Sequence, residues 1–214
     1  MKSFLIIGMG TFGQHLCREL SKHKCEIMIS DLKEEPMEDL LPLVVSAKVC
    51  DCSKAEVLKT FDIPSFDVCF VCIDSVFQAC LEITDQLREL GAKKIYSKAD
   101  HSLEAKFLLR SGADQIIFPE RDAAARIAAS ESYDRIFDCI ELSGDCSIFE
   151  VEPHPDWIGK SIGEMGFRNN FNLNIIAAKT DGGLRPVLDP GYLFKQGEHV
   201  MVMGSMSDVR KFAK

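Results

Sequence analysis

Short apolar runs alternate with longer amphipathic segments over the first 118 residues of the chain. The apolar runs predict strands near residues 3–7, 26–30, 44–49, 67–73, 94–97 and 115–118. The amphipathic segments predict helices near residues 12–22, 53–60, 76–90 and 102–111, while the short segment 34–41 stays unassigned. Strands that alternate with helices are typical of a parallel sheet covered on both faces. The expected fold class is therefore α/β, with a Rossmann-like, doubly wound parallel sheet of six strands.

The pattern changes after residue 118. Segment 120–133 carries Ala123, Ala124, Ile127 and Ala128 on one helical face, where small side chains allow close packing. We interpret it as a crossover or dimer helix, or as the last helix of the sheet domain. Further apolar stretches predict short strands near 137–142, 147–152, 174–179 and 199–203, and a last helix near 206–212. The sequence thus predicts two domains, residues 1–134 and a small α+β domain of residues 135–214.

A glycine-rich turn, Gly-Met-Gly-Thr-Phe-Gly at residues 8–13, joins the first predicted strand to the first predicted helix. Its first glycine allows a sharp turn, its second lets a pyrophosphate approach the backbone, and its third lets the helix pack close to the sheet. The N–H groups and the dipole of that helix then face the phosphates. Asp31 ends the second predicted strand, where a carboxylate accepts both hydroxyl hydrogens of an adenosine ribose. Together these features predict a bound adenine nucleotide.

Composition narrows the class of protein. The formal net charge of −8 and the sequence pI near 5.2 argue against a general affinity for nucleic acid or anionic lipid, because both need a positive field. No apolar run approaches the roughly eighteen residues that span a bilayer, and the first residues show no signal-peptide pattern. The expected location is the cytoplasm.

Nine cysteines raise the question of disulfides or a metal site. Cys69 and Cys72 lie three apart within one predicted strand, so their side chains point to opposite faces and cannot share a metal. Cys50 and Cys52 can face the same way, but no second pair of ligands follows at zinc-ribbon spacing. We therefore expect buried, reduced thiols and no metal site.

Catalytic signatures do not accompany the glycine turn. There is no Tyr-x-x-x-Lys pair, and the five histidines share no motif with a carboxylate. The interpretation is therefore that the chain is not an enzyme. Two alternative functions would use the same glycine turn and Asp31: an NAD(H)-dependent oxidoreductase and a redox sensor. For a redox sensor that regulates genes, the chain shows no basic recognition helix.

A set of motifs in fixed order resembles a known family. After the glycine turn and Asp31 come Cys-Asp-Cys-Ser at 50–53, Ser-Lys-Ala at 97–99, Gly-Ala-Asp at 112–114, Phe-Pro-Glu at 118–120 and Lys-Gln-Gly-Glu-His-Val-Met-Val-Met-Gly at 195–204. The whole chain is similar to the regulatory subunits of bacterial potassium uptake systems of the TrkA and KtrA type. These carry the RCK fold, an RCK N-terminal domain followed by a TrkA C-terminal domain.

The resemblance implies a set of ligand-binding positions. The phosphates would be lined by the glycine turn, the ribose held at Asp31, the adenine placed by the Asp51 segment and the crevice closed by the end of the fourth strand. Lys98 and Glu120 would lie near the terminal phosphate, Glu120 as a cation contact between subunits. The implied nucleotide-binding residues are Gly8, Met9, Gly10, Thr11, Phe12, Gly13, Asp31, Leu32, Lys33, Asp51, Cys52, Cys72, Ile73, Asp74, Lys98 and Glu120.

Two of these positions depart from the family pattern. Thr11 stands where the family commonly has Arg, so a bidentate phosphate contact is replaced by one uncharged hydroxyl. Asp74 stands where the family has Gly or another small residue, and its carboxylate would repel phosphates unless it pairs with a Lys or a metal ion. The departures favour ADP, AMP or NAD(H) relative to ATP as the ligand.

The resemblance also implies a second ligand and a set of partners. Arg168 and Asn174 lie in a segment similar to the one by which some members bind cyclic di-AMP, the alternative being a surface Arg and a turn-forming Asn. The single tryptophan, Trp157, is expected to be a packing anchor. The implied protein is a homo-oligomer, a dimer with an octameric ring as the expected form. It would sit at the inner face of the cell membrane through an integral-membrane potassium transporter subunit.

Overall fold

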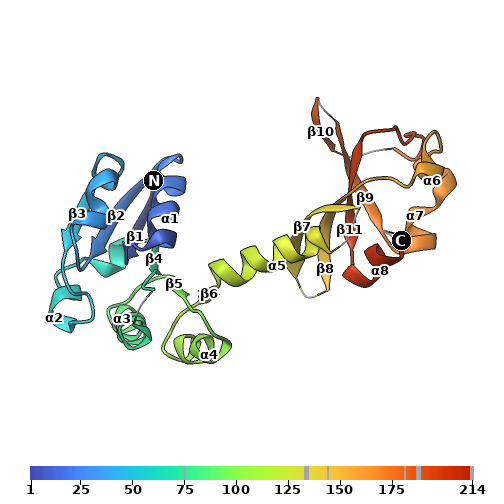
Figure 1. Cartoon of the computed structure of the whole chain (residues 1–214). Helices are drawn as coiled ribbons and strands as arrows, with labels where there is room; N and C mark the ends of the chain where they lie inside the picture. Colours follow the sequence, from blue (N-terminus) through green and yellow to red (C-terminus); the bar gives the residue numbers. More distant parts are fainter. Residues whose placement is uncertain (75, 133–134, 144, 181, 187–188, 213–214) are drawn as a thin grey trace. The chain divides into compact units, whose positions relative to one another are not determined.

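The computed structural model of the chain describes residues 1–74, 76–132, 135–143, 145–180, 182–186 and 189–212 (Figure 1). Backbone contacts divide it into two compact units, Met1–Arg121 and Asp122–Lys214. The domain boundary predicted after residue 134, and the predicted helix end at residue 133, lie outside the described residues. Within the described part, no helix is both long enough and apolar enough to cross a bilayer.

The first unit is a six-stranded parallel sheet with helices on both faces (Figure 1). Its strands run in the order β3-β2-β1-β4-β5-β6, which is the Rossmann order and confirms the expected fold class. The elements are β1 (Lys2–Ile7), α1 (Thr11–Ser21), β2 (Cys25–Asp31), η1 (Glu35–Leu43), β3 (Ser46–Val49), α2 (Ala55–Leu58), η2 (Ile63–Ser65), β4 (Val68–Val71), α3 (Phe77–Glu89), β5 (Ile95–Lys98), α4 (Ser102–Arg110) and β6 (Gln115–Ile117). The order reverses between β1 and β4, so a crevice opens at their carboxyl ends.

The uninterrupted apolar run of β1 is explained by burial on both faces of the sheet. Leu5 and Ile7 belong to a core shared with α3 and α4, whereas Phe4 and Ile6 belong to a second core shared with α1 and η1. Successive strand residues alternate between the two cores because side chains along a strand point to opposite faces. Strands buried in this way hold the turns at their carboxyl ends in fixed positions.

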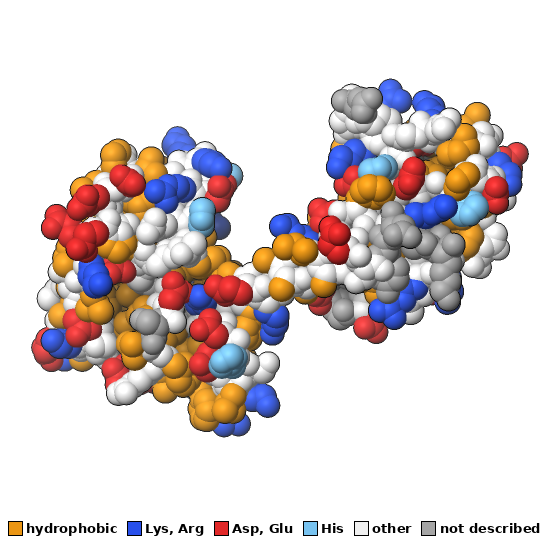
Figure 2. Space-filling view, viewed as in Figure 1, with side chains coloured by type: hydrophobic (Ala, Val, Ile, Leu, Met, Phe, Trp, Pro, Cys, Tyr) orange, Lys and Arg blue, Asp and Glu red, His pale blue; other side chains and the backbone are white. Residues whose placement is uncertain are grey.

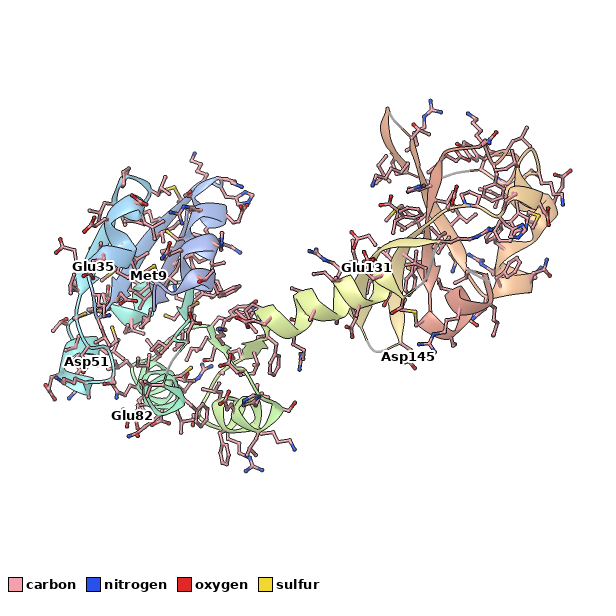
Figure 3. All side chains as sticks on the ribbon, viewed as in Figure 1. Met9, Glu35, Asp51, Glu82, Glu131 and Asp145 are labelled. Atoms are coloured by element: carbon pink, nitrogen blue, oxygen red, sulfur yellow. The ribbon has the colours of Figure 1, made fainter. Side chains whose placement is uncertain are left out.

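Two local elements differ from the sequence-based expectation. The unassigned segment is the 3-10 helix η1, which has Pro36 in its first turn and Pro42 inside it. Helix α2 is shorter than the predicted 53–60, because the Asp51 carboxylate accepts the Ser53 N–H at 3.1 Å and holds a turn that delays the helix start. Figure 2 shows acidic side chains gathered over η1, where Glu35 is labelled in Figure 3.

The second unit is a five-stranded antiparallel sheet with short helices, in the strand order β10-β9-β11-β8-β7. The four predicted strands are present, and β10, α6 and α7 are additional elements. The bounds are β7 (Ile136–Ser143), β8 (Cys146–Val151), η3 (Pro155–Trp157), α6 (Ile162–Met165), α7 (Phe167–Phe171), β9 (Asn174–Thr180), β10 (Gly183–Pro186), β11 (His199–Gly204) and α8 (Met206–Phe212). This confirms a small α+β domain after the Rossmann-like one.

Aromatic side chains form the centre of the second unit. Trp157 is buried, and its ring lies 5.2 Å from that of Phe167, 5.5 Å from Phe171 and 6.2 Å from Phe194, measured between centroids. Trp157 is thus the packing anchor that the sequence predicted. Helix α5 (Pro119–Glu131) begins in the first unit by sequence, and the described small-residue face around Ile127 is exposed on this chain. Its role as a crossover or dimer helix stays a prediction.

Candidate functional site

The glycine turn has the geometry that its sequence predicts. Gly8 has φ +95°, and a Cβ there would lie 2.8 Å from the backbone carbonyl of Cys72, so both conformation and space require glycine. A Cβ on Gly13 would overlap the carbonyl oxygen of Gly8, which shows how closely α1 packs against the turn. Gly10 is the N-cap of α1 and offers no side chain to the first N–H groups of the helix. The N–H groups at the start of α1, at Thr11, Phe12 and Gly13, therefore receive no hydrogen bond from an N-cap side chain, and such groups are the donors that bind anions at helix N-termini.

Asp31 fixes this turn from the end of β2. Its Oδ2 accepts the backbone N–H of Met9 at 2.6 Å, and its Oδ1 accepts the N–H of Lys33 at 3.0 Å. An ionised carboxylate has about four acceptor positions, so each oxygen keeps capacity for a further donor such as a hydroxyl. One side chain thus both shapes the turn and offers acceptors next to it.

A cavity of about 350 Å³ opens at the carboxyl ends of β1 and β4, the switch point of the sheet. Met9 and Asp51, labelled in Figure 3, both line it. It brings together eleven of the predicted residues: Gly8, Met9, Gly10, Asp31, Leu32, Lys33, Asp51, Cys52, Cys72, Ile73 and Asp74. It also includes residues that the sequence reasoning missed: Ile7, Pro36, Cys50, Val76, Ala79 and Ile83. Most of these are apolar and carry no chemical signal; Cys50 belongs to the Cys-Asp-Cys motif.

One rim of the cavity is the turn that contains Asp51. Its Oδ1 accepts from the Ser53 hydroxyl at 2.6 Å and from the Ser53 N–H, and the Ser53 hydroxyl is the main cause that lowers the pKa of Asp51. On either side of Asp51, the thiols of Cys50 and Cys52 both contact the hydroxyl of Ser30, at 3.2 and 3.3 Å. The two thiols therefore face the same way, as the spacing allowed.

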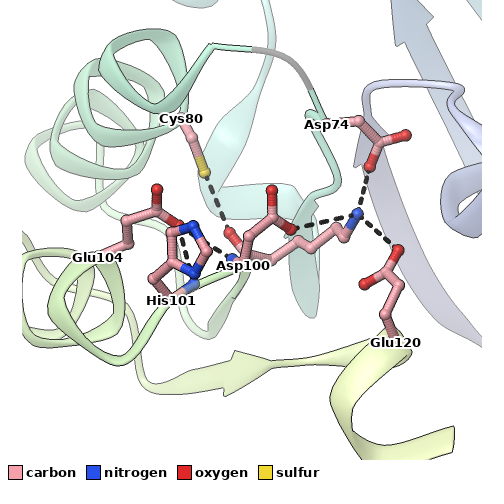
Figure 4. A network of polar contacts seen from close by, with 7 residues as sticks. Asp74, Cys80, Asp100, His101, Glu104 and Glu120 are labelled. Carbon is pink, nitrogen blue, oxygen red and sulfur yellow. Dashed lines mark hydrogen bonds and ion pairs between the residues drawn. The ribbon is translucent and has the colours of Figure 1, made fainter. Parts of the chain in front are cut away.

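Asp74 also lines the cavity and pairs with a buried lysine (Figure 4). Lys98 is 6% exposed, and its Nζ lies 2.6 Å from Asp74 Oδ1, 3.0 Å from Glu120 Oε1 and 3.6 Å from Asp100 Oδ1. Burial acts to lower the pKa of Lys98, but its hydrogen bonds to Asp74 and Glu120 outweigh burial and raise that pKa. The hydrogen bond from Lys98 also lowers the pKa of Glu120. Five predicted residues do not line the cavity: Lys98 and Glu120, which contact it only through Asp74, and Thr11, Phe12 and Gly13.

The position of Asp74 restricts what can occupy the turn. A Cβ built on Gly10 would overlap Asp74 Oδ2, so the carboxylate lies over the glycine at which a phosphate would approach the backbone. Asp74 pairs with Lys98, and a lysine partner is one of the two conditions under which a carboxylate was expected beside phosphates. A phosphate that approaches Gly10 would therefore meet the Asp74 carboxylate.

The other expectations can be placed as well. Arg168 Nε donates to Asn174 Oδ1 at 2.9 Å on the surface of the second unit, so the structure brings this pair together. Cys69 packs in the core under α3 and α4 and Cys72 in the core under α1, on opposite faces as expected. Over the residues that the structure describes, no group of three or more His, Cys, Asp or Glu side chains is arranged to hold a metal ion.

The strand order and the turn at the switch point place the first unit in the Rossmann-like class of domains. The sequence matches the TrkA-N domain over residues 4–119 and the TrkA-C domain over residues 146–214. The chain therefore belongs to the family that combines a TrkA-N with a TrkA-C domain. This confirms the resemblance to the TrkA and KtrA type that the motifs indicated.

Known relatives agree with this assignment. Ktr system potassium uptake protein C of Bacillus subtilis (strain 168) is 32% identical over 215 residues, which cover 100% of this chain and 96% of that protein. The GsuK RCK domain has a similar fold, with a TM-score of 0.67, 19% identity and coverage of 99% of this chain and 47% of that one.

Two further solved structures with a similar fold are bound to a nucleotide. The GsuK channel bound to NAD has a TM-score of 0.67, 18% identity and coverage of 97% of this chain and 38% of that one. The Kef CTD of Shewanella denitrificans in its AMP-bound form has a TM-score of 0.53, 22% identity and coverage of 61% of this chain and 80% of that one. The chain thus spans less than half of the GsuK chains, and these likenesses establish the fold.

Proposed function

We propose that this chain is a nucleotide-sensing regulatory subunit that gates an integral-membrane potassium transporter or channel. Its family and its potassium uptake relative support the role in potassium transport. The observation that carries the sensing step is the cavity at the switch point, where the glycine turn, Asp31 and Asp51 meet. The chain would act without catalysis, at the inner face of the membrane through its partner.

The proposed ligand is an adenine nucleotide. The ribose would bind at Asp31, the adenine would lie toward Asp51 and Cys52, and the phosphates would meet the first turn of α1. NAD in GsuK and AMP in the Kef domain support this class of ligand, since both proteins share the fold. Because Thr11 stands in place of the family's Arg and Asp74 lies over Gly10, NAD(H), ADP and AMP rank ahead of ATP.

Gating requires more than binding. A ligand shifts a conformational equilibrium only if it binds the two conformations with different affinities. We propose that the chain forms dimers within a ring, octameric in its complete form, and that nucleotide binding changes the ring. The exposed face of α5 around Ile127 suits a contact between copies of the chain.

Thermal stabilisation by ATP, ADP, AMP, NAD, NADH and cyclic di-AMP identifies the ligand directly. Asp31→Ala should abolish the stabilisation given by the nucleotide that binds, because the ribose loses its acceptor. Asp67→Ala is the matched control: Asp67 also accepts a backbone N–H, that of Ser3 at 3.0 Å, but near the opposite end of β1. Stabilisation that survives in Asp31→Ala would refute the assignment of the site.

Assembly is tested separately by light scattering of the full chain. A dimer or a larger ring is expected at micromolar concentration, and a strict monomer would contradict the ring mechanism. For the second ligand, Arg168→Ala and Asn174→Ala should each remove any stabilisation by cyclic di-AMP while that by the first nucleotide remains. Equal stabilisation of these variants and the unaltered chain by cyclic di-AMP would place that ligand elsewhere.

A further inference from the structure

Two thiols in the wall of the cavity are placed to react with each other. Cys50 Sγ and Cys52 Sγ lie 3.9 Å apart, and both contact the Ser30 hydroxyl. Residues two apart in sequence have Cα atoms no more than about 7 Å apart, close to the range that disulfides span. Both cysteines are free and both line the cavity.

We propose that Cys50 and Cys52 form an oxidisable dithiol, a modification site at which a peroxide closes a disulfide inside the candidate nucleotide cavity. The site goes beyond nucleotide sensing, and only its effect on ligand binding rests on the proposed function. Disulfides in reducing compartments are usually transient and redox-sensing, so a reversible bond of this kind suits a regulatory chain.

The two cysteines have different surroundings, which sets the order of reaction. Cys50 is half-buried at the cavity wall, while Cys52 is 3% exposed. Burial raises the pKa of Cys52 to about 12, an effect that the Ser30 hydroxyl partly opposes by its hydrogen bond. Because peroxide reaches the more exposed thiol more easily, Cys50 reacts first and Cys52 resolves the product.

The chemistry is balanced with one peroxide. The sulfur of Cys50 attacks one peroxide oxygen, the O–O bond breaks, and a sulfenic acid and one water form. The sulfur of Cys52 then attacks the sulfur of Cys50, the S–O bond breaks, and the second water leaves with the Cys52 proton. Two thiols are oxidised and the peroxide is reduced to two waters. Proximity favours the second step, since the two sulfurs are already close to contact.

Formation of the disulfide between Cys50 and Cys52 would change the cavity wall. The sulfur separation falls from 3.9 Å to the S–S bond length of about 2 Å, so the segment around Asp51 must contract. The Ser30 hydroxyl also loses both thiol partners. Since Asp51 lies between the two cysteines on the cavity rim, we expect oxidation to weaken nucleotide binding by about tenfold.

Peptide mapping tests the dithiol directly. Trypsin cleaves after Lys48 and Lys54, so residues 49–54 form one peptide with both cysteines, while residues 136–160 form another with Cys139 and Cys146. The full chain is treated with hydrogen peroxide, alkylated and digested. The expected result is a 49–54 peptide lighter by two hydrogen atoms and unalkylated, restored by a thiol reductant, before peptide 136–160 changes.

Single substitutions make the result decisive. Cys50→Ser and Cys52→Ser should each abolish the disulfide in peptide 49–54. A peptide 49–54 that stays fully alkylated at a peroxide concentration that oxidises peptide 136–160 would overturn the proposal. So would a bridge from either cysteine to a different peptide in place of the internal disulfide.

The effect on the cavity is measured with the same samples. The affinity for NAD and ADP is determined before and after oxidation, with Cys50→Ser, which lacks the thiol that reacts first, treated identically as the control. About tenfold weaker binding that appears only in the unaltered chain is the expected result. Equal affinity in both states would overturn the link to the cavity. If the reduced chain binds neither nucleotide nor any other of the panel, the proposed function fails while the disulfide result stands on its own.

Discussion

The carboxylate of Asp74 should limit the affinity for phosphates, and Asp74→Asn should relieve this limit. The substitution keeps the shape of the side chain over Gly10 and removes its charge. It also weakens the 2.6 Å ion pair with Lys98, which leaves the ammonium group available to a phosphate. Both effects strengthen the binding of phosphate-bearing ligands.

The expected size follows from the position of Asp74. Two like charges about 4 Å apart repel each other by about 4 kcal/mol at an effective dielectric constant of 20 and by about 1 kcal/mol in water. The Asp74 side chain is 39% exposed and is partly neutralised by Lys98, so the lower figure applies. A change of about 1 kcal/mol corresponds to about fivefold tighter binding.

Calorimetric titration of adenosine, AMP, ADP and ATP measures this effect. The gain in Asp74→Asn should be absent for adenosine, appear with AMP and increase with phosphate charge. Asp100→Asn is the matched control, because Asp100 is 3.6 Å from Lys98 and should change these affinities by less than about twofold. Unchanged or weaker ADP binding in Asp74→Asn, or an equal gain for adenosine, would refute the reasoning.

Two further predictions concern stability. Gly13→Ala should destabilise the first unit by about 1–3 kcal/mol, because its Cβ overlaps the carbonyl oxygen of Gly8; Gly182→Ala, with 3.7 Å to Thr180, should leave the melting temperature unchanged. Hydrogen bonds from Asn172, Lys211 and Ser205 lower the pKa of Asp208 to about 2. Its carboxylate therefore stabilises the folded chain above about pH 4, and this stabilisation is lost as the pH falls toward 2. Asp208→Asn should therefore lower the urea midpoint at neutral pH, with the difference shrinking toward pH 2. The fluorescence of the single tryptophan, which lies in the core of the second unit, reports this unfolding.

The sheet and its ligand-side turn could be predicted because local sequence determines them. The six apolar runs became six parallel strands, Gly8 is required by its own positive φ of +95°, and Gly13 is required by its contact with Gly8 within the same turn. Helices α6 and α7 were missed because four or five residues are too few to show a helical period. The capping box of Ser161 and Glu164 was a readable signal for α6 that the sequence reasoning did not use.

The pairing of charged residues around the cavity could not be predicted from local sequence. Asp74 and Lys98 are 24 residues apart, and Lys98 and Glu120 are 22 apart, so their pairing depends on the strand order and not on local pattern. The same holds for the contact of the Ser30 hydroxyl with Cys50 and Cys52, which requires β2 to lie beside the segment after β3. The sequence predicted a repulsion between the Asp74 carboxylate and phosphates. The identity of the lysine that neutralises Asp74 became clear only from the fold.

This network links the glycine turn to the helix that follows the sheet. Asp74 lies over Gly10 three residues after β4 ends, Lys98 ends β5, and Glu120 belongs to the first turn of α5 (Figure 4). Any group that displaces the Asp74 carboxylate from Gly10 must break or shift a 2.6 Å contact with Lys98, which in turn holds Glu120 at 3.0 Å. Because Lys98 is buried, an unpaired ammonium there is costly, so its remaining bonds to Glu120 and Asp100 must strengthen or a phosphate must replace Asp74. Two ion pairs therefore connect the residue that lies over the turn to the first turn of α5.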